Sequence, residues 1–553
     1  MLTAINRWES LCEGAGAEAL TSLLPDILQA RRWFGGKARR IKTVSIAESI
    51  AVSAEAVTML LLMIRVEYSD GKAETYQMPV TAAFGNEAMR LQRDCPQAVM
   101  APLAVRSDRG EETGVLYDAL WSPALARTLL QAIRQGGQFQ GASGTITATP
   151  TRAFDNLVAA GHPQDPVVLN AEQSNTSVSY GGQVILKFYR RVEEGINPDL
   201  EIGRHLTDVR FPYVPPIAGA IEYRRASGEP MTLALLQQFV RNDGDAWRHS
   251  LNAVDRFMFR IVGGPYRDAA PPGRGRPLLD LAREEYAPEA RELIGLYLQS
   301  AECLGQRTAE LHLALSQIEG DPAFTPEWLT SEYRHHRHDN MVAATNQTLA
   351  LLNERVALLS PGGQAAARQL FDLKPVLDRT CRAFRDLERP VSLIRCHGDY
   401  HLGQVLCTGS DFMIIDFEGE PARSLASRRM KHPAMLDVAG MVRSFHYAPF
   451  AFLEGKRTGL AAASQDLPKE SLRWAQFWSD WASAAFLKAY LGIASTSRFW
   501  PKEERDVRLL FDVFLVEKAI YELGYELNNR PDWVEIPLHG LVDLLGMAGS
   551  ERA

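Results

Sequence analysis

Two carboxylates and a side-chain amide gather in one short stretch of the chain, Ile394 to Pro421. Asp399 follows an apolar run, Gln404 stands five positions later, and Asp416 ends a second apolar run. In kinase-type phosphotransferases one carboxylate accepts the proton of the acceptor hydroxyl, while an amide and a second carboxylate hold the magnesium ions on the ATP phosphates. We therefore expect Asp399 to be the catalytic residue, which deprotonates or orients the acceptor hydroxyl, and Gln404 and Asp416 to be the Mg²⁺ ligands. Two carboxylates that merely end strands are the alternative, which the joint spacing disfavours.

A lysine far upstream could act on the same phosphates. The run Val184 to Tyr189 reads as the second strand of a hairpin with a Gly-Gly turn, and it carries Lys187 among apolar neighbours. Kinases place a phosphate-binding lysine on such a strand and an acidic partner on the next helix. Glu201 in the helical segment 199–206 is the expected partner. A lysine that only extends to the sheet edge is the alternative.

The rest of the nucleotide site is predicted by position. The hydroxyl-rich segment 174–179, which includes Ser177, takes the place of a glycine-rich phosphate loop. The strand-like run 231–240 ends where a two-lobed kinase has its hinge, so Gln238 and Val240 are the expected adenine contacts.

The elements around these residues suggest an α+β protein. Residues 1–30 have helical spacing, 43–80 alternate like antiparallel strands around a turn at 69–72, and 286–390 are mostly long amphipathic helices. A segment rich in Gly, Ser and Thr at 136–149 and a segment rich in Gly and Pro at 262–277 read as loops.

Composition limits the classes of protein. The chain has 553 residues, so two or three domains are expected. A net charge of -7 without long basic runs argues against a nucleic-acid or membrane-surface binder. The six cysteines lack metal-like spacing, no secretory signal is visible, and the apolar patch 57–64 is too short to span a bilayer. We expect a cytoplasmic protein.

Three further patterns have competing explanations. The basic cluster Arg31 to Lys37 could bind an anion or be an aromatic plug with solvated charges. His335, His336 and His338 resemble a metal cluster, but their spacing favours a polar helix surface. Glu517, Tyr521 and Tyr525 recur every four residues and could form either core or a sugar-stacking face, and the tryptophans at 474, 478 and 481 could line the same cleft or pack in the core.

The strings HGDYHLGQVL and IDFEGEPARSL resemble those of the maltokinase family, which is related to aminoglycoside phosphotransferases and protein kinases. RRWFGGKAR, SNTSVSYGG and EKAIYELGYELNNRPDW extend the resemblance over nearly the whole chain. It implies a bilobal protein-kinase-like fold with an N-terminal cap subdomain (1–90), a β-rich intermediate subdomain (91–240) and a mainly helical C-lobe (241–553), with ATP between the lobes.

The implied activity is ATP-dependent, Mg²⁺-assisted phosphorylation of maltose on its anomeric hydroxyl, giving maltose 1-phosphate for α-glucan (glycogen) synthesis. The implied acceptor-binding residues are listed here: His401, Arg443, Glu517, Lys518, Tyr521 and Tyr525. The resemblance also suggests association with trehalose synthase, in a monomer or homodimer. A kinase for another sugar or amino sugar and a non-catalytic nucleotide- or partner-binding module remain the alternatives.

Overall fold

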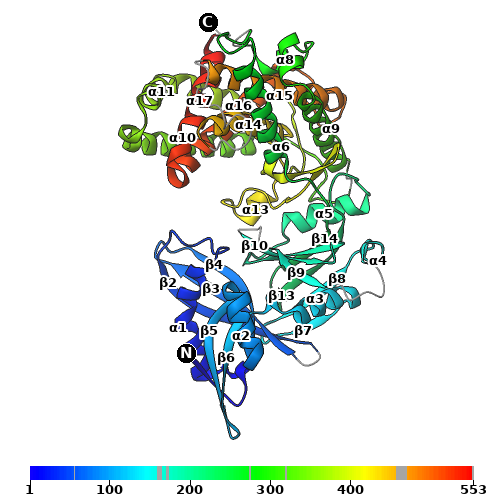
Figure 1. The fold of residues 1–553 in the computed structure, drawn as a ribbon. Helices are drawn as coiled ribbons and strands as arrows, with labels where there is room; N and C mark the ends of the chain where they lie inside the picture. The colour runs from blue at the N-terminus through cyan, green and yellow to red at the C-terminus, as the bar shows by residue number, and fades with distance from the viewer. Residues whose placement is uncertain are drawn as a thin grey trace. The chain divides into compact units, whose positions relative to one another are not determined.

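The computed structural model describes residues 1–54, 57–158, 165–169, 174–272, 276–317, 320–455 and 470–550. The chain forms two compact units, Met1–Arg241 and Asn242–Ala553, and each is described separately (Figure 1). Among the described residues, no helix has the length and apolar character needed to cross a bilayer.

The first sheet of the N-terminal unit has the strand order β1-β5-β6-β4-β3-β2, with β12 paired to β4. Its strands are β1 (Leu2–Ile5), β2 (Ile41–Ala54), β3 (Val57–Tyr68), β4 (Ala73–Phe84), β5 (Val99–Ser107), β6 (Gly110–Asp118) and β12 (Arg191–Val192). Helix α1 (Gly14–Ala30) packs against this sheet through Leu20, Leu24 and Leu28 (Figure 1). Because β5 and β6 join it, the sheet extends well past residue 90, where the sequence placed the end of the cap.

The second sheet carries Lys187 and has the order β7-β8-β13-β14-β11-β10-β9. Its strands are β7 (Gln138–Gln140), β8 (Gly144–Pro150), β9 (Pro166–Leu169), β10 (Asn175–Tyr180), β11 (Val184–Tyr189), β13 (Ile217–Arg225) and β14 (Met231–Gln238), flanked by helices α3 (Pro123–Gln135) and α5 (Pro198–Asp208). The expected hairpin is present as β10 and β11. Gly181 and Gly182 form its turn with φ of 57° and 65°, a backbone region that favours glycine.

Two loop predictions in this unit are wrong. Residues 136–149 contain β7 and most of β8, because Ile146 and Ala148 alternate with threonines and point into the core. Residues 174–179, expected to be a phosphate-covering loop, lie almost entirely in β10. The chain between Leu169 and Ser174 lies outside the described residues.

One buried side chain joins the two sheets of the N-terminal unit. Gln77, on β4, is fully buried and donates from Nε2 to the carbonyl oxygens of Tyr189 and Leu233, each at 2.6 Å. Its backbone N–H also donates to Arg190 O at 2.9 Å. The sheet of the cap is thereby hydrogen-bonded to β11, the strand that carries Lys187, and to β14.

The C-terminal unit is mainly helical, as expected. Its longer helices are α6 (Ala246–Gly263), α9 (Tyr297–Ser316), α10 (Ser331–Arg355), α11 (Pro361–Asp372), α12 (Lys374–Arg385), α14 (Met435–Leu453), α15 (Ser471–Ala494), α16 (Glu504–Asn529) and α17 (Glu535–Ser550). Trp474, Trp478 and Trp481 are buried among these helices. Trp481 also lines a cavity of about 280 Å³, whose lining does not include the α16 residues Glu517, Tyr521 and Tyr525. The short hairpin of β17 (Val405–Thr408) and β18 (Asp411–Ile414) leads into Asp416.

Candidate active site

The two loops predicted to carry the chemistry lie side by side in the C-terminal unit. His397 Nε2 is 2.9 Å from the carbonyl oxygen of Ile415, the residue before Asp416. The Ile415 N–H donates to Gln404 O at 3.0 Å. Gln404 Nε2 donates to Asp416 Oδ2 at 2.9 Å, so the two expected metal ligands are in contact. These bonds bring the loop of Asp399 and the loop of Asp416 to one place.

Asp416 adopts an uncommon backbone conformation, with a φ of 68°. A residue other than glycine in this region carries a steric cost, which occurs preferentially at functional sites. Gln404 uses its amide nitrogen on Asp416 and therefore keeps its side-chain oxygen as an acceptor. Carboxylate and amide oxygens are the ligands that hard divalent cations prefer, so the residues present fit Mg²⁺.

Asp399 is half-buried and faces a cation. Lys518 Nζ on α16 donates to Asp399 Oδ1 at 3.2 Å, and His401 Nε2 lies 4.0 Å from Oδ2. Burial raises the pKa of Asp399, but Lys518, His401 and His397 outweigh burial, and the pKa falls below its usual value. Burial also destabilises the charged form of His401. It lowers the pKa of this imidazole, which favours its neutral form at neutral pH. Asp399 is therefore a carboxylate in position to accept a hydrogen bond from a hydroxyl.

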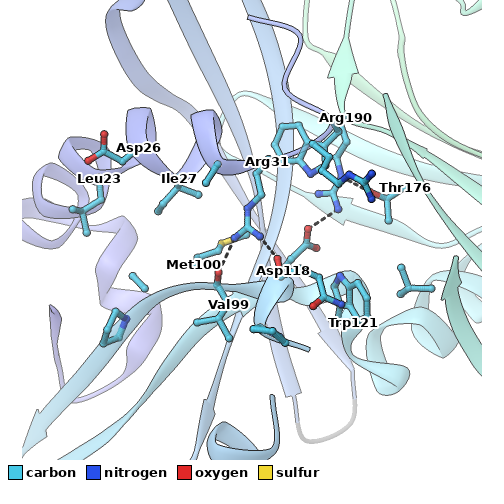
Figure 2. Close-up of a pocket in the computed structure, with 18 of the residues that line it drawn as sticks. Leu23, Asp26, Ile27, Arg31, Val99, Met100, Asp118, Trp121, Thr176 and Arg190 are labelled. Carbon is cyan, nitrogen blue, oxygen red and sulfur yellow. Dashed lines mark hydrogen bonds and ion pairs between the residues drawn. The ribbon is translucent and has the colours of Figure 1, made fainter. Parts of the chain in front are cut away.

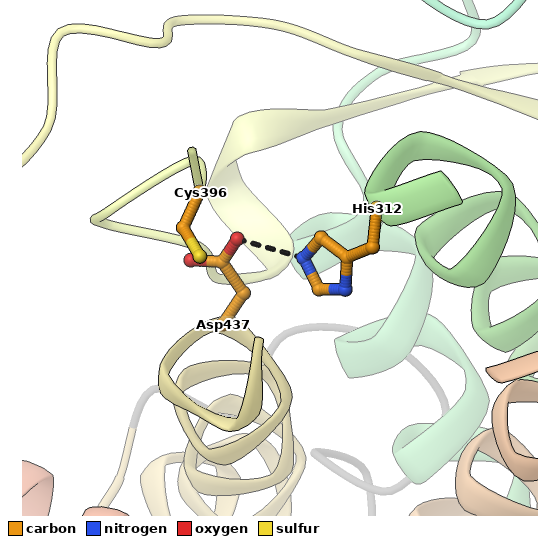
Figure 3. A group of neighbouring side chains, drawn as sticks. All are labelled: His312, Cys396 and Asp437. Atoms are coloured by element: carbon orange, nitrogen blue, oxygen red, sulfur yellow. Dashed lines mark hydrogen bonds and ion pairs between the residues drawn. The ribbon is translucent and has the colours of Figure 1, made fainter. Parts of the chain in front are cut away.

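A buried trio supports the Asp399 loop from behind (Figure 3). Asp437, near the start of α14, accepts from the backbone N–H groups of His397 at 2.8 Å and Gly398 at 2.9 Å. Its Oδ2 also lies 3.0 Å from His312 Nε2. Cys396 completes the trio, and burial raises its thiol pKa far above the usual range, so it remains neutral. Because the Asp437 oxygens are occupied and the thiol is protonated, the trio is a loop brace and a poor metal site.

The predicted aromatic stripe on α16 borders a cavity of about 650 Å³. The rings of Tyr521 and Tyr525 stack at 6.4 Å between centroids, and Lys518 Nζ lies 5.0 Å from the Tyr521 ring centroid. Lys518 thus connects this cavity wall to Asp399. Burial and the neighbouring Glu420 carboxylate raise the pKa of Tyr521, so its hydroxyl is protonated and can donate.

Two predicted acceptor-binding residues are already held by other side chains. Glu517 Oε2 accepts from Arg337 Nε and a terminal nitrogen at 3.0 and 2.8 Å, although Glu517 still lines the cavity. Arg443 is 2% exposed and pairs with Glu522 at 2.7 Å. A direct bond from Arg443 to a sugar is therefore disfavoured, and its effect on the site would pass through Glu522.

The N-terminal unit holds Lys187 in an ion pair. Lys187 is 8% exposed, and its Nζ donates to Asp199 Oδ2 at 3.1 Å; Tyr189 donates to the same oxygen at 2.9 Å. Sequence reasoning named Glu201 as the partner and did not name Asp199; the pairing with Glu201 stays a prediction. Asn197 caps α5 by accepting from the Asp199 N–H, which places Asp199 in the first turn of the helix. The available signal in the sequence was Asp199 itself, an acidic residue two positions before Glu201.

The other predicted nucleotide contacts are placed as follows. Ser177 is buried and lies directly opposite Lys187 in the register of β10 and β11, so both side chains share one face of the sheet. Gln238 donates its backbone N–H to Pro216 O at 3.0 Å, which leaves that N–H occupied. Val240 follows the end of β14. Their nucleotide roles, and that of Glu201, stay predictions.

The three histidines on α10 make separate local contacts. His335 Nδ1 lies 2.7 Å from Ser331 O, His338 Nδ1 lies 3.0 Å from Asp339, and the Asn340 amide approaches His336 at 3.3 Å. In the described part of the chain they do not converge with other ligand side chains. A polar helix surface explains them.

Comparison with known proteins agrees with this geometry. The maltokinase N-terminal cap domain matches residues 28–121. Glucosamine kinase from Streptacidiphilus jiangxiensis is 23% identical over 477 residues, covering 82% of this chain and 94% of that protein. Glucosamine kinase from Mycolicibacterium smegmatis (strain ATCC 700084 / mc(2)155) is 24% identical over 382 residues, covering 68% and 79%.

A solved structure confirms the fold. Glucosamine kinase in complex with glucosamine, ADP and inorganic phosphate superimposes with a TM-score of 0.59 at 18% identity, over 95% of this chain and 99% of that one. The predicted α+β, two-lobed kinase-like fold with an N-terminal cap is therefore confirmed.

Proposed function

We propose that the chain is a sugar kinase that transfers the γ-phosphoryl group of ATP to the anomeric hydroxyl of maltose, because residues 28–121 match the maltokinase N-terminal cap domain and its curated relatives are sugar kinases. The observation that carries the proposal is the convergence of Asp399, Gln404 and Asp416 through the His397–Ile415 and Gln404–Asp416 contacts. Such a site supplies a base and metal ligands, which phosphoryl transfer requires.

In this mechanism the acceptor hydroxyl donates its proton to Asp399 as its oxygen bonds to the γ-phosphorus. The bond from that phosphorus to the β,γ-bridging oxygen breaks, and ADP leaves. Lys518 holds the Asp399 carboxylate in place and keeps it ionised. Gln404 and Asp416 would hold Mg²⁺, which neutralises phosphate charge when bound. In the N-terminal unit, Lys187, fixed by Asp199, would contact the phosphates.

The shape of the acceptor wall supports a disaccharide. Tyr521 and Tyr525 present two adjacent rings along α16, and sugar rings bind aromatic faces through their C–H groups. Tyr525 is 39% exposed, so part of its ring is accessible, and the Arg530 guanidinium carbon lies 5.3 Å from the ring centroid. The first ring of maltose would lie near Lys518 and Tyr521, and the second beside Tyr525. Supply of maltose 1-phosphate to glycogen synthesis, association with trehalose synthase and a cytoplasmic location form part of the same proposal.

An amino sugar is the second candidate, because both curated relatives are glucosamine kinases. Glu420 and Glu522 both raise the pKa of Lys518, the residue that contacts Asp399, so they are the carboxylates that an acceptor ammonium would use, although Glu522 is already paired with Arg443. The whole chain is incubated with ATP, Mg²⁺ and either maltose, glucosamine or glucose, and the products are identified by ³¹P NMR. Maltose 1-phosphate as the main product is expected. Phosphorylated glucosamine with no maltose turnover would make glucosamine the acceptor. No ADP release with any of the three sugars would favour a non-catalytic module.

Removing the Tyr525 ring should distinguish a disaccharide acceptor from a monosaccharide acceptor. Tyr525→Ala should raise the KM for maltose by about three- to tenfold, since stacking on an aromatic ring contributes roughly 0.5–1.5 kcal/mol. It should leave the KM for a monosaccharide within about twofold. Phe259→Ala, which truncates an exposed aromatic on α6, is the matched control. An equal rise for both acceptors would contradict the two-ring arrangement.

A further inference from the structure

The N-terminal unit contains a cavity of about 840 Å³ that the proposed kinase reaction does not use. It lies among the C-terminal end of α1, the segment that begins with Arg31, the start of β5, and Arg190 (Figure 2). Leu23, Ile27 and Met100 give it an apolar wall. Lys187, Asp399 and Asp416 are not among its lining residues.

Arg190 lines this cavity although it is only 1% exposed. Its Nη2 pairs with Asp118 at 2.5 Å, and its Nε donates to Thr176 at 2.9 Å (Figure 2). Its Nη1 has no hydrogen-bond partner in the described part of the chain. A buried guanidinium nitrogen without a partner costs stability unless something else accepts its hydrogen bonds.

Arg31 brings a second positive charge to the same place. Its terminal nitrogens donate to the backbone oxygens of Gln97 and Val99, and its buried Nε is likewise unpartnered among the described residues (Figure 2). Backbone oxygens accept hydrogen bonds but carry no net charge. Burial lowers the pKa of Arg31, Asp118 raises it, and Arg190 lowers it further, so the two cations and the single carboxylate act on one another.

The charges in the cavity do not balance. Arg31 and Arg190 contribute two positive charges, and Asp118 contributes one negative charge. Arg32 and Asp26 also line the cavity, but both are exposed and opposite in sign. One positive charge thus stays uncompensated beside the buried Arg190 guanidinium, and a bound anion would balance it.

We propose that this cavity is a binding site for a small organic anion, either a phosphate monoester or a carboxylate. Arg31 and Arg190 hold the anionic group, and the apolar part of the ligand lies along Leu23, Ile27 and Met100. Arginine is suited to this task because its planar fork matches both phosphate and carboxylate oxygens.

The test is calorimetric titration of the whole chain, with ADP and Mg²⁺ present to fill the proposed nucleotide site. Phenyl phosphate, benzoate and inorganic phosphate are the three probes. Phenyl phosphate or benzoate should bind with one site per chain, and the stronger of the two identifies the anionic group. Inorganic phosphate should bind more weakly, because it lacks the apolar part. No binding of any probe would overturn the proposal.

Variants assign the site. Arg31→Gln should weaken binding about tenfold or more, which corresponds to the loss of a charge-assisted hydrogen bond. Its exposed neighbour provides the matched control, and Arg32→Gln should change affinity less than about threefold. Unchanged binding in Arg31→Gln would refute the assignment.

Met100→Glu gives an independent readout if Arg31→Gln does not fold. It places a carboxylate in the cavity, so it should abolish binding of the probes and raise the melting temperature of the ligand-free chain. A lower melting temperature with full probe binding would contradict the proposal.

Discussion

Asp399 has its charge stabilised by a specific neighbour, Lys518, at 3.2 Å. A carboxylate held in this way is ionised at neutral pH. It can therefore act as a general base that takes the proton of the acceptor hydroxyl during phosphoryl transfer. Asp399→Asn should therefore lower kcat by about 100- to 10,000-fold, the usual contribution of a general base. ADP release is the measurement. Asp386→Asn, at an exposed helix end, is the control, and ATP affinity should stay within about threefold in both.

We expect Lys518 to set the acid limb of the pH–rate profile. It lowers the pKa of Asp399, whereas burial raises it. Replacing the cation in Lys518→Met leaves burial to act, so the pKa of Asp399 rises and the carboxylate protonates at a higher pH. The acid limb of kcat/KM should then move to higher pH, independently of any loss in amplitude. Lys502→Met, which changes an exposed lysine before α16, should leave the limb in place. An unmoved limb in Lys518→Met would contradict this role.

Asp416 is expected to make the reaction depend on a divalent cation. EDTA should abolish ADP release by the unmodified chain, and added Mg²⁺ should restore it. Asp416→Asn removes the charged oxygen ligand, so it should lower activity about 100-fold or more at ordinary Mg²⁺ and shift half-activation to higher Mg²⁺. Activity that survives EDTA would remove the metal from the mechanism.

At the scale of elements, the Asp437 brace fixes the loop between β16 (Ser392–Leu393) and β17. Asp437→Ala would leave the N–H groups of His397 and Gly398 and the imidazole of His312 without an acceptor. Each buried donor that loses its acceptor costs about 1–3 kcal/mol. The free energy of unfolding, measured by urea denaturation, should therefore fall by at least about 3 kcal/mol. Asp378→Ala, which breaks a half-exposed helix pair with Lys374, should cost less than about 0.5 kcal/mol.

The brace also has a signature in acid. Burial raises the pKa of Asp437, but His312 and the Gly398 N–H outweigh it, so the folded pKa lies below the usual value. The contribution of Asp437 is therefore present above the unfolded pKa of about 3.9 and lost as pH falls through the folded pKa. The free energy of unfolding of Asp437→Ala should therefore fall less between neutral and acidic pH than that of the unmodified chain. An identical acid transition in both chains would exclude Asp437 as its source.

Sequence reasoning located elements well where local pattern decides them. The Gly181-Gly182 turn fixed the hairpin, and the spacing of Gln404 and Asp416 anticipated their contact. It failed where tertiary contacts decide. The start of α5 brings Asp199 to Lys187, a buried pairing with Glu522 occupies Arg443, and the threonine-rich segment at 144–150 becomes a strand because it pairs with β13. None of these depends on residues adjacent in sequence.

At the scale of the whole molecule, the comparisons and the site answer different questions. The cap match and the kinase-like superposition determine the fold over nearly the entire chain, at identities too low to fix an acceptor. We propose that a few side chains on α16 recognise the acceptor instead. Product identity therefore has to be measured, and the Tyr525→Ala comparison shows which part of the wall recognises it.

Gln77 has a consequence for dissecting this protein. Its amide bonds two carbonyl oxygens of the Lys187-bearing sheet while its own strand belongs to the cap. Removing the cap would leave those two oxygens without their donor. It would also expose to solvent the apolar residues of the Lys187-bearing sheet that pack against the cap. A shortened chain that starts after residue 121 should thus be insoluble, and the cap is better studied by point substitution than by truncation.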